Sequence, residues 1–558
     1  MDNKVTAKEI LESYEQITVE KEIFDGVFLF TLFGKTFLLS CPKSDKADSQ
    51  PEILLYNDEG FDFPHIMLQE ESVMGSKDLP AGKYRMVCLY EQESLVFSLI
   101  TYEDKIYDII DRLIELLSMT PIEKEREFQK EFMYYWNSMA SNIVADVFLS
   151  QDTEFVCMDV FTGKQGTRYI ENGLKLTDLS MYDKEGRLWE HHLENNVFYI
   201  PIVDSRGILP PYRGYSWSVK QVKDIIYGNQ IEHISLETFQ RIKSEIVSTQ
   251  DFVLVFGMSV VQSKVTFAIK VKSKNTIGRT LLQKICEDII TVEPIRITRK
   301  DYSFLSYQIG NDIGLREKKV LLIGGGSLGS YVAFELVKNG VSSLKIFDGD
   351  RLTCENIMRW AFGGIGVGNN KAILLGVQLG LLHPEIHVEG INKNIDPESL
   401  VEEAQAADLI IFTIGSSDSQ LVFNRVLHDA QCQVPVIYTW LEAGGQYSHI
   451  LTVNYFERGC YECLFTNEQG ELVNNRTNHN QDENFDSKMI KNGCGGTRAA
   501  YGTAVLLRTT AALLESIKKM NSGERQDGIL INITPEKTYV SSNIIPMEAC
   551  NCCGNRKE

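Results

Sequence analysis

A glycine-rich turn between a strand and a helix constrains the fold of this chain more than any other feature. The segment KKVLLIGGGSLGSYVAFELVKNG begins at Lys318 and contains a G-x-G-x-x-G motif formed by Gly324, Gly326 and Gly329. The apolar run before the motif predicts a buried strand, the residues after it predict a helix capped by Gly340, and SSLKIFDGD predicts the next strand. Together with the later strand candidates LIIFTIG and VPVIYTW, this βαβ unit predicts a mostly parallel, doubly wound sheet.

The glycine motif also indicates a phosphate site, because bare backbone amides at a helix N-terminus can face an anion. Taken alone, it is typical of a dinucleotide-binding domain in which Asp348 would hold a ribose. The charged residues that follow favour another family. The runs DGDRLTCENIMRW, GNNKAILL and GSSDSQLVFNR contain, in order, Asp348, Asp350, Asn356, Arg359, Lys371 and Asp418.

In this order and spacing, the segment resembles the adenylation domain of the ThiF/MoeB and ubiquitin-activating family. The resemblance implies that the six residues and the glycine turn bind ATP, with Asp348 at the ribose and Asp418 positioning magnesium. Asn356, Arg359 and Lys371 would contact the triphosphate and offset its charge while a carboxylate approaches the α-phosphorus. Family members usually carry an Arg-Gln pair before the first strand, whereas this sequence offers only Arg316 near that place.

Two CxxC pairs, Cys460/Cys463 and Cys550/Cys553, have the composition of a four-cysteine structural zinc site. Similar pairs occur in ThiF-like proteins, so the resemblance also implies Zn²⁺. A redox dithiol and uncommitted cysteines are the alternatives, and Cys552 could replace Cys550 as the fourth ligand.

A long polar stretch, TNEQGELVNNRTNHNQDENFDSK, separates Cys463 from Cys494. Cys494 lies in NGCGGTRAAYGTAVLL, where we expect the N-terminus of a helix, and a helix start and Arg498 would both lower its thiol pKa. The alternative is a small residue packed in a glycine-rich turn. In activating enzymes that form a thioester, the cysteine follows such a loop, so the resemblance implies that Cys494 is a catalytic nucleophile.

The N-terminal part predicts a separate α+β domain ending near residue 125. A helical pattern runs from Ala7 to about Ile17, the β-rich runs GVFLFTLF, KTFLLSC and PEILLYN follow, and a second helical pattern covers about 102–119. The run GKYRMVCLYEQESLVFS resembles the active-site stretch of ubiquitin-conjugating enzymes, with Cys88 as the acyl acceptor. The His-Pro-Asn signature of that family is missing, Cys41 is the other candidate, and a buried core cysteine is the structural alternative.

Composition limits the partners. With 56 basic and 76 acidic residues and a net charge of −20, the chain is not expected to bind nucleic acid or an anionic membrane. No apolar segment approaches the roughly 20 residues that span a bilayer, and the N-terminus lacks the apolar stretch of a signal peptide. We therefore expect a cytoplasmic protein.

We thus expect a conjugating-enzyme-like domain in residues 1–125, a linker or accessory domain in 126–300, and a Rossmann-like ThiF adenylation domain in 301–558. This arrangement resembles the bacterial activating/conjugating fusion enzymes of CBASS antiphage systems. The resemblance implies that ATP activates a glycine-like protein C-terminus, belonging to a ubiquitin-like protein or a cGAS/DncV-like nucleotidyltransferase, for transfer to a target lysine. It also implies a homodimer. A sulfur-carrier or peptide-modifying adenylyltransferase and a non-catalytic partner subunit remain alternatives.

Overall fold

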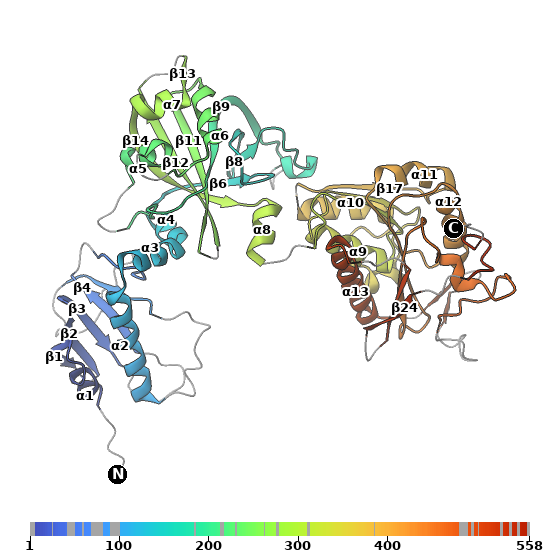
Figure 1. Ribbon diagram of the computed structural model, residues 1–558, viewed down its shortest axis with the longest axis horizontal. Helices are drawn as coiled ribbons and strands as arrows, with labels where there is room; N and C mark the ends of the chain where they lie inside the picture. Colours follow the sequence, from blue (N-terminus) through green and yellow to red (C-terminus); the bar gives the residue numbers. More distant parts are fainter. Residues whose placement is uncertain are drawn as a thin grey trace, which may run out of the picture. The chain divides into compact units, whose positions relative to one another are not determined.

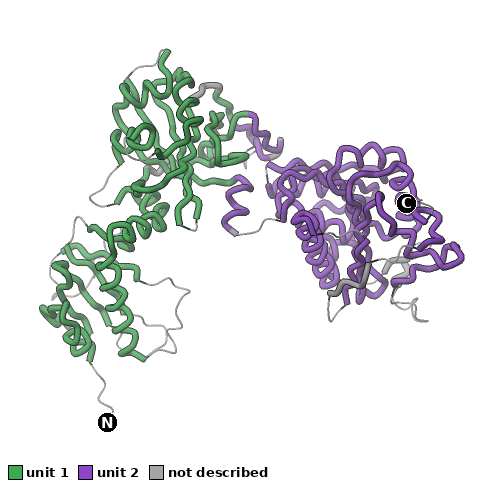
Figure 2. The backbone as a smooth tube through the Cα atoms, in the orientation of Figure 1, with its two compact units in different colours: residues 1–172, 190–300 green, residues 173–189, 301–558 purple. Residues whose placement is uncertain are grey.

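The protein is described by a computed structural model (Figure 1). The described residues are 6–24, 26–41, 51–57, 61–67, 82–89, 101–182, 186–212, 217–228, 232–261, 263–274, 278–309, 313–383, 385–478, 489–492, 496–499, 501–524, 528–534, 538–543 and 547–554. They form two compact units: residues 1–172 with 190–300, and residues 173–189 with 301–558 (Figure 2). Within the described part, no helix combines the length and apolar character needed to cross a bilayer.

The first unit begins with an antiparallel meander covered by helices. Strands run in the order β1 (Ile17–Phe24), β2 (Val27–Leu32), β3 (Lys35–Ser40), β4 (Glu52–Tyr56) and β5 (Tyr84–Met86). The long helix α2 (Tyr102–Ser118) lies against this sheet in Figure 1 and buries one apolar face, as its sequence period predicts. The first helix, α1 (Ala7–Glu12), ends earlier than expected, because Ile17 already begins β1.

The rest of the first unit is a closed barrel that the sequence did not reveal. Two short helices, α3 (Pro121–Lys130) and α4 (Phe132–Met139), lead into it. Seven strands close the barrel in the order β11-β12-β14-β6-β8-β7-β9. Their bounds are β6 (Ser141–Phe148), β7 (Val156–Gly163), β8 (Gly166–Glu171), β9 (Glu190–Ile202), β11 (Asp251–Val260), β12 (Ser263–Ser273) and β14 (Ile289–Arg299).

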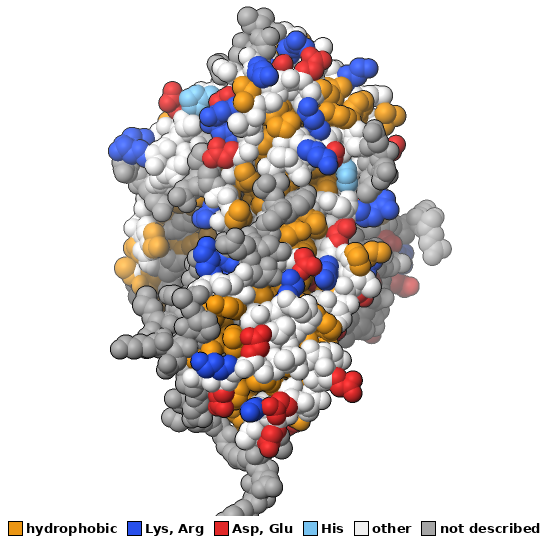
Figure 3. All heavy atoms as spheres, turned by 90° about the vertical axis from the view of Figure 1, so that its left-hand side faces the viewer, with side chains coloured by type: hydrophobic (Ala, Val, Ile, Leu, Met, Phe, Trp, Pro, Cys, Tyr) orange, Lys and Arg blue, Asp and Glu red, His pale blue; other side chains and the backbone are white. Residues whose placement is uncertain are grey.

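Helices cover one outer face of the barrel. The aromatic side chains of α4 pack there, with the Trp136 ring 4.7 Å from Phe267 and 5.2 Å from Trp217. The Trp136 indole N–H also donates to the Ile295 carbonyl at 3.1 Å, so its polar atom is satisfied in the core. The remaining elements of this region are α5 (Val219–Tyr227), α6 (Leu236–Ser244), α7 (Leu281–Gln283) and the strand pair β10 (Ile246–Val247) and β13 (Arg279–Thr280). In the view of Figure 3, acidic and basic side chains of the described residues are interspersed rather than gathered by sign.

The second unit contains the predicted doubly wound sheet. Its strand order is β17-β16-β15-β18-β19-β20-β23-β24, with the first five strands parallel and the last three antiparallel to their neighbours. The bounds are β15 (Lys319–Ile323), β16 (Ser343–Phe347), β17 (His387–Ile391), β18 (Leu409–Phe412), β19 (Val436–Leu441), β20 (Ser448–Val453), β23 (Ile529–Ile533) and β24 (Thr538–Asn543). The fold predicted for this region is therefore confirmed.

Helices cover both faces of this sheet. One core contains residues of α9 (Ser327–Lys338), α10 (Lys371–Leu382) and α13 (Thr503–Asn521), and the other contains residues of α11 (Pro397–Ala406) and α12 (Ser417–Asp429). Helix α9 ends where predicted, since Gly340 follows it with a positive φ of 76°. The strand order reverses around β15, whose neighbours are β16 and β18, and ligands of open α/β sheets bind at such a point beyond the carboxyl ends of the strands.

Candidate functional site

The glycine turn lies at this reversal, directly after β15. Gly324 has a φ of 104°, and a Cβ on Gly329 would lie 2.0 Å from the Gly324 carbonyl oxygen. Both positions therefore require glycine for the close approach of α9 to the strand end. Gly326 differs, because it is the N-cap of α9 and a Cβ there would meet nothing within 4 Å. Its bare backbone leaves space beside the first amides of the helix.

Asp348 ties the next strand to this turn. It follows β16, and its carboxylate accepts hydrogen bonds from the amides of Gly325 at 2.7 Å and Asp350 at 2.8 Å. Burial raises the pKa of Asp348 above its usual range, although the nearby Lys371 charge and the two amide donors oppose that shift. A buried carboxylate is thus fixed at the switch point beside the glycine turn.

Lys371 and Asp350 complete a network around Asp348. The Lys371 ammonium lies 2.9 Å from an Asp350 carboxylate oxygen, and its side chain is mostly buried. The neighbouring residue Asn370 donates from its amide nitrogen to the Asp348 carbonyl at 2.7 Å and caps α10. Three of the predicted residues, Asp348, Asp350 and Lys371, are therefore brought together.

The other predicted residues lie on neighbouring segments. Asn356 lies in the first turn of the short 3-10 helix 354–359, where its side-chain oxygen accepts from the hydroxyl of the N-cap residue Thr353 at 3.1 Å. The Arg359 guanidinium lies over the Tyr501 ring, 4.8 Å from its centre. Asp418 is exposed in the first turn of α12, beyond β18, and among the described residues no hydrogen bond joins it to the Asp348 network.

Trp360 links the 3-10 helix to the glycine turn by donating its indole N–H to the Gly325 carbonyl at 3.0 Å. The segment that carries Asn356 and Arg359 is therefore anchored at the glycine turn. Arg316 is exposed in the turn before β15.

The four cysteines of the two CxxC pairs form one buried cluster. The sulfur atoms of Cys460, Cys463, Cys550 and Cys553 all lie within 4.8 Å of one another. A tetrahedral zinc ion with bonds of about 2.3 Å would separate its sulfur ligands by about 3.8 Å, so these residues could hold one. Cys552 lies outside the group, where its sulfur accepts from the Asn424 side-chain amide at 3.3 Å. The geometry thus favours Cys550 over Cys552 as the fourth ligand.

An ion pair supports this cluster. Between the first two cysteines, the buried carboxylate of Glu462 accepts two hydrogen bonds from Arg425, at 2.6 and 2.9 Å. These bonds raise the pKa of the Arg425 guanidinium. The paired geometry fixes the orientation of the segment that presents Cys460 and Cys463.

The two candidate cysteines of the N-terminal domain have opposite environments. Cys88 is exposed just beyond β5, whereas Cys41 is buried, and this burial raises the pKa of the Cys41 thiol to about 11. A thiol that stays protonated and covered is a poor nucleophile. The structure therefore makes Cys88 the accessible one of the pair, and the buried alternative does not apply to it.

A histidine that the sequence analysis did not single out lies beside Cys88. Ile66 and Val87 form an antiparallel bridge with buried side chains, and next to it the Cys88 amide donates to the His65 carbonyl at 2.7 Å. His65 has a positive φ of 67°, an uncommon backbone conformation for a residue other than glycine. The only sequence sign of it was its place in FDFPHIML, upstream of the cysteine run.

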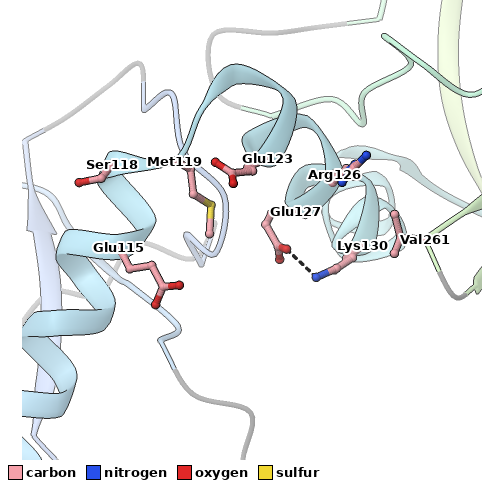
Figure 4. A pocket seen from close by; sticks show the side chains of 8 residues that line it. All are labelled: Glu115, Ser118, Met119, Glu123, Arg126, Glu127, Lys130 and Val261. Carbon is pink, nitrogen blue, oxygen red and sulfur yellow. Dashed lines mark hydrogen bonds and ion pairs between the residues drawn. The ribbon is translucent and has the colours of Figure 1, made fainter.

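Carboxylates surround this histidine. The two ring nitrogens of His65 lie 3.3 Å from Glu127 and 3.6 Å from Glu131. Glu127 also lines a cavity of about 470 Å³ beside α2 and α3, where it faces Lys130 at 2.5 Å (Figure 4). Both ring nitrogens therefore face carboxylates, and the contact of His65 with Cys88 is made through the backbone.

Comparison with known proteins identifies the C-terminal part. The ThiF family model matches residues 310–551. This part of the chain belongs to the ThiF family. ATP binding is expected of a ThiF adenylation domain, in agreement with the network around Asp348.

Individual relatives match the chain in part. The ATP-dependent ubiquitin transferase-like protein Cap2 of Enterobacter hormaechei subsp. hoffmannii (strain UCI 50) is 38% identical over 120 residues, which cover 21% of this chain and 20% of that protein. Ubiquitin-like modifier-activating enzyme 5 of Drosophila erecta is 23% identical over 231 residues, covering 38% of this chain and 52% of that enzyme. The chain therefore spans a fifth to about half of the length of these relatives.

Among solved structures, E. coli MccB with ATP is 22% identical, with a TM-score of 0.35 and coverage of 43% of this chain and 68% of MccB.

One predicted residue of the ThiF domain, Cys494, lies outside the described residues. The expectation that it begins a helix is wrong, because strand β22 (Gly496–Ala499) follows it and helix α13 begins only at Thr503. Strand β22 pairs with β21 (Met489–Asn492). The catalytic role of Cys494 therefore stays a prediction.

Proposed function

We propose that this protein is an ATP-dependent activating enzyme that adenylates the C-terminal carboxylate of a protein substrate. The observation that carries the proposal is the network of Asp348, Asp350 and Lys371 at the glycine turn of a ThiF domain. These residues would hold ATP, and Asp418 would hold Mg²⁺, which draws negative charge from the phosphates. The substrate carboxylate attacks the α-phosphorus, the bond to the β-phosphate breaks, and pyrophosphate leaves.

The acyl-adenylate then passes through two thiols. The Cys494 thiolate attacks the acyl carbon, a C–S bond forms, and AMP leaves. The Cys88 thiolate takes the acyl group by exchange, and Cys494 recovers a thiol. A target lysine amine finally attacks the Cys88 thioester, forming an amide and releasing the thiol, so the energy of ATP is kept until an amine arrives.

The N-terminal domain suits the second thiol step. A helix-covered antiparallel meander presents an exposed Cys88 next to a histidine, which supports a conjugating-enzyme-like role. The His65 carbonyl would hold the backbone of Cys88 in place, with Glu127 and Glu131 fixing the His65 ring.

Partners are proposed on the same basis. The substrate would be a protein with a glycine-like C-terminal tail, either a ubiquitin-like protein or a cGAS/DncV-like nucleotidyltransferase, in the cytoplasm and in antiphage defence. The relative named as a ubiquitin transferase-like protein supports conjugation. The cysteine cluster would bind one structural Zn²⁺.

An apolar surface supports a homodimer. Several large side chains in the segment before α10 and on α10 itself are exposed, among them Met358 at 84%, Ile365 at 68% and Leu381 at 61%. Where such side chains form one contiguous patch, they mark a protein–protein contact. A second copy of this chain is the occupant we propose for this surface.

The deciding experiment follows the substrate on a non-reducing gel. Purified protein, MgATP and a candidate substrate ending in glycine are incubated with wild type, Cys494→Ala or Cys88→Ala. A DTT-sensitive adduct that is lost in Cys494→Ala and retained in Cys88→Ala supports the two-cysteine relay. Adenylate formation without an adduct would assign the protein to the sulfur-carrier or peptide-modifying adenylyltransferases, and no adenylate at all would indicate a non-catalytic partner subunit.

A further inference from the structure

The interior of the barrel changes from apolar to polar toward one end. Ala268 on β12 and Ile295 on β14 are paired neighbours in the apolar interior cluster. Because side chains alternate along a strand, Thr266 and Lys264 share the inward face of Ala268, and Arg299 shares that of Ile295. The same barrel end therefore receives a hydroxyl and two cationic groups from adjacent strands.

A cavity of about 330 Å³ opens among these groups. Asp152, in the loop after β6, lies at its wall and accepts hydrogen bonds from Lys264 at 2.9 Å and Arg299 at 3.3 Å. The Tyr199 hydroxyl donates to the Asp152 backbone carbonyl at 2.9 Å, which fixes this loop over the barrel end. Lys264 and Arg299 together carry two positive charges against the one negative charge of Asp152, so these three side chains leave the cavity wall net positive.

A buried polar atom in the wall has no partner. Thr266 is only 4% exposed, lines the cavity, and its hydroxyl makes no hydrogen bond among the described residues. Buried hydroxyls are normally satisfied, and an unsatisfied one is destabilising. The opposing residue on β11 is Gly257, where a Cβ would lie 2.0 Å from the Tyr199 hydroxyl, so the Tyr199 side chain takes the place of one on β11. The unmet hydroxyl of Thr266 lies in the wall of the cavity.

We propose that this end of the barrel binds a small organic acid. Its carboxylate would lie between Lys264 and Arg299, and a further oxygen would bond the Thr266 hydroxyl. Small-molecule sites occur at the mouths of barrels and have volumes of about 300 Å³ and above, which fits this cavity. The site is independent of the proposed adenylation chemistry, because none of its residues belongs to the ThiF domain.

The test measures binding to the full-length protein by calorimetry and thermal shift. The probes are acetate, lactate and succinate, with acetamide and succinamide as uncharged analogues and inorganic phosphate as a different anion. At least one carboxylate should bind and raise the melting temperature, about tenfold more tightly than its amide. If no carboxylate binds at 10 mM, or if phosphate alone binds, the proposal is wrong.

Variants separate binding from folding. Lys264→Met should weaken the bound carboxylate at least tenfold, whereas Lys272→Met, an exposed lysine on the same strand, should leave its affinity unchanged. Thr266→Val should weaken it about fivefold without lowering the melting temperature of the ligand-free protein, since the valine removes an unsatisfied hydroxyl. Equal affinity in Lys264→Met and Lys272→Met would overturn the assignment.

Discussion

Replacing Gly329 by alanine should disrupt the nucleotide site by a calculable amount. The new Cβ would lie 2.0 Å from the Gly324 carbonyl oxygen and 2.7 Å from the Thr413 hydroxyl. Normal contact requires α9 to move away from the strand end by about 1 Å, and overpacking of this kind costs about 1–3 kcal/mol. At about 2–4 °C per kcal/mol for a domain of this size, the ThiF domain should melt roughly 2 to 12 °C lower.

The matched control is Gly326→Ala at the N-cap of the same helix. Its Cβ would meet nothing within 4 Å, so the melting temperature should change little. ATP affinity should nevertheless fall at least about tenfold, because a methyl group would occupy space that the phosphates approach. Scanning calorimetry and ATP titration of both variants give the two readouts. An unchanged melting temperature for Gly329→Ala would refute the packing argument, and unchanged ATP affinity for Gly326→Ala would refute the phosphate argument.

Three further predictions concern the cysteines and one buried carboxylate. Cys460→Ser should lose a bound zinc ion and Cys552→Ser should keep it, as measured by metal analysis of the purified proteins. At pH 8 iodoacetamide should label Cys88 and spare Cys41, because a thiol pKa of about 11 leaves about one Cys41 in a thousand ionised; peptide mass spectrometry checks this. Burial opposes ionisation of Asp152, but Lys264 and Arg299 outweigh it and lower the pKa of this carboxyl. Its stabilising effect is therefore present at neutral pH and is lost as pH falls below about 4, so Asp152→Asn should melt lower than wild type at pH 7 and approach it at pH 3.

The fold of the ThiF domain was predictable because the residues that determine it lie close together in the sequence. A strand, a glycine turn and a helix follow one another within one short segment, and the acidic strand end comes directly after the next strand. The resemblance to the adenylation family implied that Asp348, Asp350 and Lys371 share one site, and the structure brings these side chains together. The hydrogen bonds from the Gly325 and Asp350 amides to Asp348 could not be read from the sequence, since they depend on the exact path of the turn.

The barrel was not predictable for the opposite reason. It closes through parallel strand pairs between distant segments, β9 with β11 and β14 with β6. No local sequence pattern predicts such pairs. Its strands are recognisable one by one, but the sequence does not say which strand follows which around the barrel. The polar cavity at its end was invisible for the same reason, because Asp152, Lys264 and Arg299 are brought together only when the barrel closes.

The helix that was expected to begin at Cys494 begins later in the chain, at Thr503. The apolar pattern of α13 is real, but its N-cap is Gly502, and the residues before it form a strand pair. The prediction placed the N-terminus of this helix too early in the chain, and it placed the C-terminus of the first helix too late. Helix ends depend on caps and neighbours that a periodic pattern does not contain.

The glycine motif itself could not decide between a dinucleotide and ATP, and the structure explains why. Gly324 and Gly329 allow the helix to pack closely against the strand, which every domain of this architecture needs. Gly326 is not required for that packing, because a Cβ there would meet nothing within 4 Å. Two of the three glycines are therefore evidence for the fold and not for the identity of the ligand. The information about ATP lies in the elements that follow, where Lys371 places a cation beside the acidic strand end that a dinucleotide site would reserve for a ribose. Discrimination between the two ligands therefore rests on Lys371 and its neighbours, and not on the motif that first drew attention to the site.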